Sequence, residues 1–160
     1  MSSMPSKDEF FQAEGFVIYG LSPNRKTFAL AIKDELEKRG KKIFAIDRSG
    51  KNGYADLQAI NNQADRAIIA MNPNNTTSVI NQLADAKIQE VFLQQGSYTK
   101  KTLAEYKKRG FQVHIGCAMM YMSDAMFMHR IHRFFKELFG GSKWDFCLSA
   151  ISWATPVFRP

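Results

Sequence analysis

Gly15-Phe16-Val17-Ile18-Tyr19-Gly20-Leu21-Ser22-Pro23-Asn24-Arg25-Lys26 is the stretch that decides how this chain folds. An apolar run ends at Gly20 and is followed by small polar and basic residues, and then by a helical pattern. A strand that runs into such a turn and a helix start presents backbone N–H groups and the positive end of a helix dipole, which both favour a phosphate. The stretch therefore predicts a site for a phosphorylated ligand. The turn lacks the complete G-x-G-x-x-G pattern, so it names no particular nucleotide.

Short apolar runs alternate with helical patterns along the rest of the chain. The apolar runs are rich in β-branched and aromatic residues, as is typical of buried parallel strands, and they are residues 16–19, 43–46, 67–71, 91–93 and 113–115. The helical patterns between them are residues 27–39, 54–62, 76–86 and 102–109. This alternation favours right-handed crossovers and a sheet covered on both faces. The predicted fold is α/β, a doubly wound, mostly parallel five-stranded sheet (Rossmann-like) with a C-terminal helical and extended extension.

Apolar spacing predicts which face of each helix is buried. The expected residues are Phe28, Ala31, Ile32 and Leu36 in the first helix and Val79, Ile80 and Leu83 in the third. Glycine follows two of the helical patterns, at Gly40 and Gly110, where a helix terminator belongs.

Composition limits the class of protein. The chain has 160 residues, of which 45% are hydrophobic, so it can bury one sizeable core but is short for two comparable domains. A formal charge of +7 favours anionic partners without saying which kind. Two cysteines, Cys117 and Cys147, make no disulfide framework, and residues 1–10 lack the order of a secretory signal. We therefore expect a cytoplasmic protein without a transmembrane segment.

We expect residues 1–120 to form a nucleotide-binding domain and residues 121–160 to form a C-terminal helix and a docking tail. Ser123 is a candidate cap for a helix that runs to Phe139 with one aromatic face, and residues 142–160 are rich in large apolar side chains. Such surfaces must be covered. The expected cover is the chain's own domain or a second copy, which would make a homodimer.

The predicted fold also indicates where a ligand would bind. In open parallel sheets, ligands lie outside the carboxyl ends of the strands. The loops that follow the five predicted strands carry residues 20–26, 47–52, 71–75, 94–99 and 116–119. We expect these loops to form one rim around the site.

Several short motifs, in this order and at this spacing, resemble one known family. They are Phe16-Val17-Ile18-Tyr19-Gly20-Leu21-Ser22-Pro23-Asn24, Leu36-Glu37-Lys38-Arg39-Gly40, Met71-Asn72-Pro73, Val91-Phe92-Leu93-Gln94-Gln95-Gly96, and Arg109-Gly110-Phe111-Gln112-Val113 leading to Cys117. Together they resemble the CoA-binding domain family, a Rossmann-like module found as small free-standing bacterial proteins and as the amino-terminal part of succinyl-CoA synthetase alpha subunits. No single motif would suffice for this assignment.

The resemblance implies coenzyme A or another adenine nucleotide as ligand. It places the pyrophosphate near the turn at residues 20–26. It also places the turn at residues 71–74 along the ligand, and the Gln95-Gly96 turn at the far side of the site. The expected contact residues are Gly20, Leu21, Ser22, Asn24, Lys26, Asp47, Arg48, Asn72, Pro73, Asn74, Gln95, Gly96 and Cys117. A catalytic residue is not expected among them.

The sequence departs from the family after the second strand, where Ile46-Asp47-Arg48 stands in place of the frequent Val-Asn-Pro. An acid at this position holds a ribose hydroxyl in dinucleotide-binding folds, and an adjacent arginine can accept a ribose phosphate. Arg48 could equally pair with the 3′-phosphate of CoA. The identity of the coenzyme therefore stays open between CoA and NAD(P).

Cys117 and the histidines allow further interpretations. A thiol just past the fifth strand could exchange with the thiol of CoA, but a buried cysteine that acts as a small hydrophobe is the more common case. His114-x-x-Cys117 and His129-x-x-His132 contain zinc-ligand types, yet the paired Cys-x-x-Cys spacing of structural zinc sites is absent from the sequence. We expect no metal.

Three function classes remain at this point. A binding module for CoA or a related nucleotide, without chemistry of its own, ranks first because a phosphate turn is present without a convincing set of acid, base and nucleophile. An NAD(P)-dependent oxidoreductase is the alternative, with Asp47 or Arg48 reading the ribose. A basic nucleic-acid or protein-interaction module is the third, and nucleic acid is an unfavoured partner because no recognition motif is present.

Overall fold

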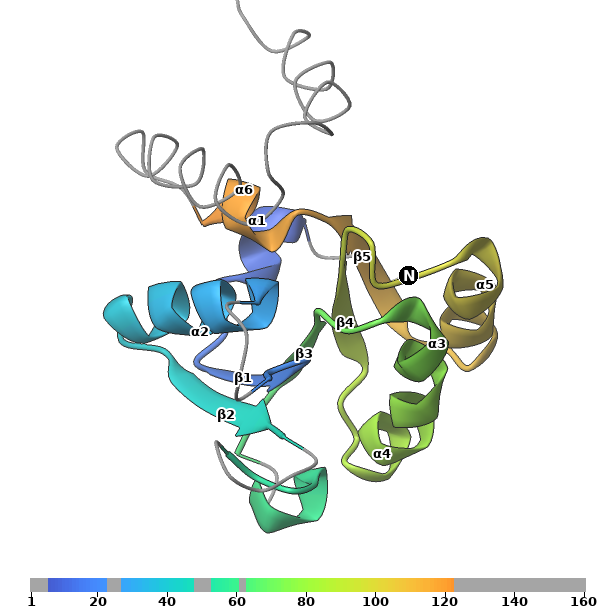
Figure 1. Ribbon diagram of the computed structural model, residues 1–160, viewed down its shortest axis with the longest axis horizontal. Coiled ribbons are helices and arrows are strands. Elements are labelled where there is room, and N and C mark those ends of the chain that lie inside the picture. Colours follow the sequence, from blue (N-terminus) through green and yellow to red (C-terminus); the bar gives the residue numbers. More distant parts are fainter. Residues whose placement is uncertain (1–5, 23–26, 48–52, 61–62, 123–160) are drawn as a thin grey trace, which may run out of the picture. The chain divides into compact units, whose positions relative to one another are not determined.

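A five-stranded parallel sheet forms the centre of the fold (Figure 1). The computed structural model describes residues 6–22, 27–47, 53–60 and 63–122. The strands are β1 (Gly15–Tyr19), β2 (Lys42–Ile46), β3 (Arg66–Ile69), β4 (Glu90–Gln94) and β5 (Gln112–Gly116). Their order is β2-β1-β3-β4-β5, and every neighbouring pair is parallel. The prediction of a doubly wound α/β fold is therefore confirmed, although β3 ends two residues earlier than expected.

Helices cover both faces of this sheet. They are α1 (Lys7–Phe10), α2 (Phe28–Lys38), η1 (Leu57–Ile60), α3 (Pro73–Thr76), η2 (Thr77–Val79), α4 (Ile80–Asp85), α5 (Lys100–Lys108) and α6 (Ala118–Tyr121). Figure 1 shows α2 on one side of the sheet, and α3, α4 and α5 on the other. The expected helix at residues 76–86 is divided between η2 and α4, with a separate turn of helix, α3, before them.

Alternate residues of each strand face opposite sides of the sheet. Val17 and Tyr19 of β1 belong to the core that η1, α4 and α5 cover, whereas Phe16 and Ile18 are buried outside this cluster. Because both faces are covered, the strands read as continuous apolar runs rather than as an alternation of apolar and polar residues.

The predicted buried face is correct for one helical segment and partly wrong for another. In α4 and η2, Val79, Ile80 and Leu83 are buried as predicted. In α2, the buried residues are Ala29, Ile32 and Leu36, so the expected contribution of Phe28 and Ala31 was wrong: both are only half-buried. The buried face of α2 is thus rotated relative to the predicted one, and it consists of smaller residues at its first turn.

The N-terminal helix α1 closes an aromatic cluster on the sheet face opposite α4 and α5. The side chain of Phe10 is 0% exposed, and its ring centroid lies 5.8 Å from that of Phe16 and 5.6 Å from that of Phe92. Arg66, at the start of β3, donates hydrogen bonds to the carbonyl oxygens of Glu9 and Phe10. These bonds join the end of α1 to the start of β3.

A second set of contacts joins α1 to α6. The ammonium group of Lys7 donates a hydrogen bond of 3.0 Å to the hydroxyl of Tyr121 and lies 5.0 Å from the centroid of the same ring. The ring of Phe11 stacks on that of Tyr121 at 6.4 Å. The two ends of the described chain therefore pack on each other over the sheet.

His114 of β5 lies in this aromatic cluster. Its side chain is 4% exposed, its ring centroid lies 5.2 Å from that of Phe10, and its Nε2 has no hydrogen-bond partner among the described residues. Burial lowers the pKa of His114 below its ordinary value; the nearby Glu90 carboxylate opposes this shift, and the Arg66 and Lys7 cations add to it. The folded protein therefore favours the neutral imidazole.

Acid is expected to destabilise the fold through His114. Below pH 6.5, the His114 side chain is protonated in the unfolded chain but stays neutral in the folded chain. The free energy of unfolding therefore falls by up to about 1.4 kcal/mol per pH unit, until the folded imidazole is also protonated. Urea unfolding at pH 7.5 and pH 5.5 measures this loss in the natural protein and in His114→Phe. His114→Phe should lose less stability, because it lacks this imidazole, whereas the carboxylates that take up protons in the same pH range are common to both proteins. An equal loss in the two proteins would contradict the assignment of this pH dependence to His114.

The described residues end at Met122, so the boundary near residue 120, the helix from Ser123 and the apolar tail lie outside them and stay predictions. No helix in the described part of the chain is long and apolar enough to cross a membrane. Residues 6–22, 27–47, 53–60 and 63–122 also hold no group of three or more side chains that could ligate a metal.

Candidate functional site

The topology creates a crevice at the carboxyl end of β1. The chain leaves β1 toward β2 on one side and later returns to β3 on the other, so β1 lies between its two successors. Tyr19, the last residue of β1, pairs with Ile46 of β2 and with Ile69 of β3. The loops after these three strands therefore begin at the same level. Such a reversal of strand order is where open α/β sheets bind ligands.

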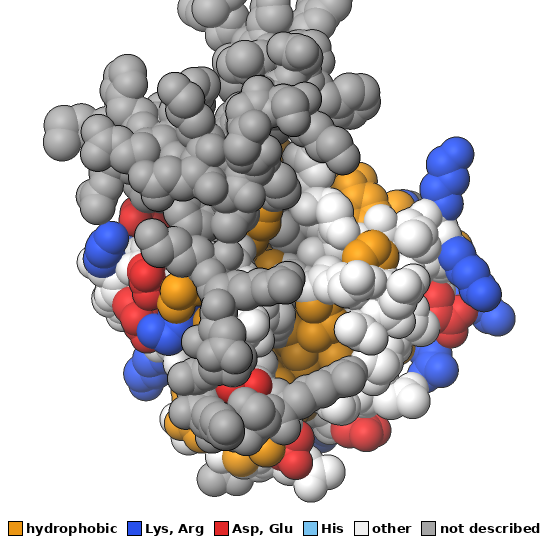
Figure 2. Space-filling model, in the orientation of Figure 1, with side chains coloured by type: hydrophobic (Ala, Val, Ile, Leu, Met, Phe, Trp, Pro, Cys, Tyr) orange, Lys and Arg blue, Asp and Glu red, His pale blue; other side chains and the backbone are white. Residues whose placement is uncertain are grey.

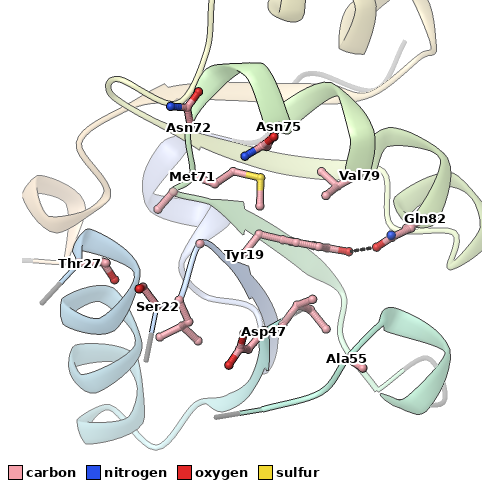
Figure 3. A pocket seen from close by; sticks show the side chains of 14 residues that line it. Tyr19, Ser22, Thr27, Asp47, Ala55, Met71, Asn72, Asn75, Val79 and Gln82 are labelled. Carbon is pink, nitrogen blue, oxygen red and sulfur yellow. Dashed lines mark hydrogen bonds between the residues drawn. The ribbon is translucent and has the colours of Figure 1, made fainter. Parts of the chain in front are cut away.

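A pocket of about 510 Å³ lies at this reversal point. Its size is within the ordinary range of small-molecule sites. Figure 2 shows a hollow with apolar surface at its floor, and Figure 3 shows the side chains around the pocket. The lining residues are Tyr19, Gly20, Leu21, Ser22, Thr27, Ile46, Asp47, Ala55, Ala70, Met71, Asn72, Asn75, Val79 and Gln82.

Gly20 allows the turn after β1 to pack directly on the chain that leaves β3. Its φ angle is +107°, and a Cβ atom at this position would lie 2.1 Å from the carbonyl oxygen of Ala70. Only glycine meets both conditions without a backbone shift. This close packing holds the turn against the start of the β3–α3 connection, and residues 20–22 of the turn line the pocket.

The N-terminus of α2 borders the pocket on the same side. Thr27 caps this 11-residue helix: its hydroxyl accepts a hydrogen bond of 3.2 Å from the N–H of Leu30, and the residue itself lines the pocket. The positive end of the helix dipole lies at this terminus. The turn and the helix start together provide the surroundings that favour a phosphate.

Tyr19 and Gln82 close the opposite wall. The phenol hydroxyl donates a hydrogen bond of 3.0 Å to Oε1 of Gln82, with Met71 and Val79 next to the ring (Figure 3). Burial raises the pKa of Tyr19 well above its ordinary value, and the negative charge of Asp56 adds to this shift. The phenol is therefore neutral at physiological pH, and it acts as a hydrogen-bonding wall rather than as a base.

Asn72 and Asn75 line the pocket from the turn after β3, and buried hydrogen bonds hold this turn in place. The hydroxyl of Thr76 donates to the carbonyl oxygen of Ser97 at 2.6 Å, and the hydroxyl of Tyr106 donates to the carbonyl oxygen of Thr76 at 2.8 Å. Because these groups are buried, losing one partner would leave another unsatisfied. The turn is thus fixed to the β4–α5 loop and to α5.

Asp47 lines the pocket from the end of β2. Its main-chain N–H donates a hydrogen bond of 2.9 Å to the carbonyl oxygen of Tyr54, and Ile46 forms a bridge with Tyr54. The segment that returns past β2 therefore holds Asp47 at the sheet edge. The same segment contributes Ala55 to the pocket.

The structure brings together some of the residues expected from the sequence. Those that line the pocket are Gly20, Leu21, Ser22, Asp47 and Asn72. Asn24, Lys26 and Arg48 lie outside the described residues. This pocket is not lined by Pro73, Asn74, Gln95, Gly96 or Cys117. Its loop residues follow β1, β2 and β3, whereas we expected all five loops to form one rim. The role of those five residues as ligand contacts stays a prediction.

Cys117 precedes α6 and is 5% exposed. It is therefore buried, as the more common interpretation of a cysteine predicts. Gln94 Oε1 accepts a hydrogen bond of 2.9 Å from the N–H of the next residue, Ala118, which fixes the chain directly after Cys117.

Sequence reasoning missed several lining residues. Those outside the expected loops are Tyr19, Thr27, Ile46, Ala55, Ala70, Val79 and Gln82. Thr27 carries a recognisable signal, since threonine before an apolar-periodic segment is a common helix cap. Gln82 carries none, because its contact with Tyr19 depends on how α4 packs on the sheet.

Most lining side chains that the structure describes are uncharged. Asp47 is the one carboxylate among them, and none of them is a lysine, arginine or histidine. Basic side chains gather instead on the outside of α5, at the right of Figure 2. This helix contains Lys100, Lys101, Lys107 and Lys108. The described lining can thus bind a polar ligand by hydrogen bonds, main-chain groups and a helix dipole.

Comparison with protein families and solved structures identifies similar proteins. A family model described as "CoA binding domain" matches residues 14–123. The comparison with curated proteins finds no match.

Solved structures support the fold. A protein redesigned for binding matches with a TM-score of 0.64 at 13% identity, over 86% of this chain and 92% of its own. A hypothetical protein from Pyrococcus horikoshii OT3 matches with a TM-score of 0.62 at 16% identity, over 76% and 95%. A conserved hypothetical protein from Pyrococcus furiosus matches with a TM-score of 0.61 at 14% identity, over 69% and 100%. At these identities the similarity is one of fold.

Proposed function

The chain belongs to the CoA-binding domain family, and we propose that it binds coenzyme A or a related adenine nucleotide in the pocket at the end of β1. The observation that carries this proposal is the position of that pocket. It lies where the strand order reverses, beside the glycine turn and the N-terminus of α2. These are the surroundings in which related folds hold a pyrophosphate.

The proposed pose follows from the chemistry of the walls. The pyrophosphate lies against the main chain of residues 20–22 and beside Thr27, where backbone groups and the helix dipole favour negative charge. The adenosine then lies in the rest of the pocket, whose walls combine apolar surface with the amides of Asn72, Asn75 and Gln82. Such a mixture of apolar surface and a few polar groups is typical of small-molecule sites.

The proposal assigns binding to this protein, without a reaction. The described lining offers one carboxylate and a neutral phenol, and it contains no histidine, lysine or cysteine that could serve as an activated base or nucleophile. An accessory or sensor role for a nucleotide fits this composition. A homodimer formed through residues 121–160 remains part of the proposal.

Asp47 supports a second candidate, an NAD(P)-dependent oxidoreductase. It stands at the end of β2 and lines the pocket, as the ribose-binding acid of dinucleotide folds does. This candidate ranks second because dinucleotide enzymes bring a substrate next to the nicotinamide, and the described lining shows no acid or base besides Asp47, which this candidate assigns to the ribose.

A thermal-shift panel with CoA, acetyl-CoA, NAD, NADP, ATP and ADP tests the proposed function. A ligand that binds only the folded state at one hundred times its Kd adds about 2.7 kcal/mol. For a chain of this length we expect the midpoint to rise by about 5–10 °C. A rise with CoA-type ligands supports the first candidate, and a preference for NADP supports the second. No rise with any of the six ligands would overturn both.

Two variants locate the site. Ser22→Glu adds a carboxylate to the pocket wall and is expected to weaken binding at least tenfold, because the new charge repels the pyrophosphate. Gln89→Glu adds the same charge on the exposed surface before β4, at the other end of the sheet, and should leave the Kd within a factor of two. Isothermal titration of both variants measures the difference.

A further inference from the structure

The outer face of α5 carries a cluster of positive charge. Residues 100–109 contain five basic side chains and one acidic side chain, so they supply more than half of the formal charge of +7. Four of the five are exposed lysines of the helix, which together we call the α5 basic face: Lys100, Lys101, Lys107 and Lys108. The ion pairs of the described residues include none of these four lysines. The acid of this stretch, Glu105, pairs instead with Arg109 at 3.4 Å.

Helix periodicity places the four lysines side by side. With 3.6 residues per turn, positions 100, 101, 107 and 108 fall within one sector of about 120°, over roughly 12 Å of the helix axis. Thr102 and Tyr106 are buried and belong to the side of the helix that packs on the sheet. Ala104 is exposed and lies between the two lysine pairs, so no carboxylate separates them. Figure 2 shows basic side chains that project from this helix into solvent.

The stability of α5 does not account for this arrangement. The first turn of the helix contains no acidic residue, and Lys100 and Lys101 put two positive charges at the positive end of the helix dipole. The helix begins because Thr99 caps it, with a hydroxyl that accepts a hydrogen bond of 3.1 Å from the N–H of Thr102. The two lysines therefore disfavour the helix where they stand. A bound anion would offset this cost.

The composition of the α5 basic face limits the class of anion that fits it. Protein interfaces depend on buried aromatic or apolar anchors, and membrane-bound basic helices insert large apolar side chains. Between its lysines this face offers Ala104 alone, and Tyr106, the one aromatic residue of α5, is buried. Single-stranded nucleic acids are held by stacking on exposed aromatic rings, which this helix also lacks. A duplex needs neither kind of contact, because its backbone presents one negative charge per about 1.7 Å of axis.

We infer that the α5 basic face binds the phosphate backbone of a nucleic-acid duplex without reading its sequence. Its four lysines can neutralise up to four phosphates. Binding of this kind rests on phosphate contacts and needs no recognition motif. No residue of α5 lines the nucleotide pocket, so the inference goes beyond the proposed function and does not depend on it.

Fluorescence anisotropy with a short labelled DNA duplex tests the inference. If four phosphates are contacted, the logarithm of the association constant falls against the logarithm of the salt concentration with a slope of about −3.6. Between about 50 mM and 200 mM salt, this slope corresponds to a loss of affinity of about 150-fold. A second duplex of unrelated sequence should bind with a Kd within about twofold of the first, because phosphates carry no sequence information.

The double variant Lys100→Gln/Lys101→Gln identifies the face. We expect the slope to become shallower by about 2 and the affinity at about 50 mM salt to fall at least tenfold, because two phosphate contacts are lost. The urea midpoint of this variant should stay the same or rise, since two cations leave the positive end of the helix dipole. A loss of binding therefore cannot come from a loss of folded protein.

Lys38→Gln/Lys42→Gln is the matched control. It removes the same net charge from exposed positions of α2 and β2, on the other side and at the other edge of the sheet. The affinity for the duplex should stay within about threefold of that of the natural protein, because these lysines do not belong to the α5 basic face.

Three outcomes would overturn the inference. The first is that the natural protein does not bind the duplex at low salt. The second is an equal loss of affinity in the two double variants, which would show attraction by the overall charge rather than by one face. The third is binding to vesicles that contain phosphatidylserine but not to the duplex, which would assign the face to a membrane surface.

Discussion

Replacing Gly20 with alanine is expected to lower the free energy of unfolding by about 3–4 kcal/mol. Two effects add at this position. The φ angle of +107° is unfavourable for a residue with a Cβ atom, and that atom would lie 2.1 Å from the carbonyl oxygen of Ala70. The main chain after β1 or β3 must therefore move. Because residues 20–22 line the pocket, the same movement should weaken nucleotide binding at least tenfold in variant molecules that remain folded. Urea unfolding and isothermal titration measure the two losses.

Gly40→Ala is the matched control for this prediction. Gly40 follows α2 with a φ angle of +74°, and nothing lies within 4 Å of the Cβ atom that alanine would add. The substitution therefore carries the cost of the backbone conformation without the collision, about 1–2 kcal/mol. It should leave the Kd unchanged. Equal losses of stability in Gly20→Ala and Gly40→Ala would show that the close approach to Ala70 has no energetic weight.

Phe10→Ala is expected to cost about 4 kcal/mol, which is a large part of the stability of a domain of this size. Phe10 is fully buried against Phe16, Phe92 and His114, and its removal leaves a cavity where α1 meets the sheet. The residue precedes the segment 14–123 that the family model matches. We therefore expect the fold of this protein to depend on a residue outside the segment that the family model matches.

Tyr54→Ala provides the comparison for Phe10→Ala. It also removes an aromatic ring, but Tyr54 is 40% exposed, and its ring contacts Phe44 at the sheet edge. We expect a loss below about 1.5 kcal/mol, measured by the same urea unfolding. If Phe10→Ala costs no more than Tyr54→Ala, the aromatic cluster is not part of the stabilising core.

The sheet could be predicted from the sequence because its strands are buried on both faces. Residues 16–19 and 91–93 are unbroken apolar runs, and the glycines after the helical patterns mark where α2 and α5 end. These signals are local. The buried face of α2 was less predictable, since Phe28 and Ala29 are adjacent and both apolar, and only packing on the sheet decides which of them is buried.

The helix α1 was not predicted, although its signal is present. Ser6 and Glu9 form a capping box, in which each side chain accepts a hydrogen bond from the other residue's backbone N–H. The helix is only four residues long, so periodicity cannot reveal it. Its stability comes from Phe10 and from the bonds of Arg66, which are distant in the sequence.

The candidate site was predictable where it depends on strand ends. Gly20, Asp47 and Asn72 follow predicted strands, and parallel strands bring their carboxyl ends to one edge. The sequence could not say which loops share a pocket, because that depends on strand order. With β1 between β2 and β3, the pocket collects the first three loops, while Gln95 and Cys117 follow strands farther along the sheet.

The contact between α1 and α6 has a consequence for synthesis of the chain. Lys7 and Tyr121, which it joins, are 114 residues apart in the sequence. At a translation rate of about 5–20 residues per second, roughly 6–23 s pass between the synthesis of one and of the other. Phe10 and Phe11 have no complete docking surface during this interval, because β4 and β5 are made later. The nascent chain therefore carries these two phenylalanine rings without their packing partners until the second half of the sheet has been made.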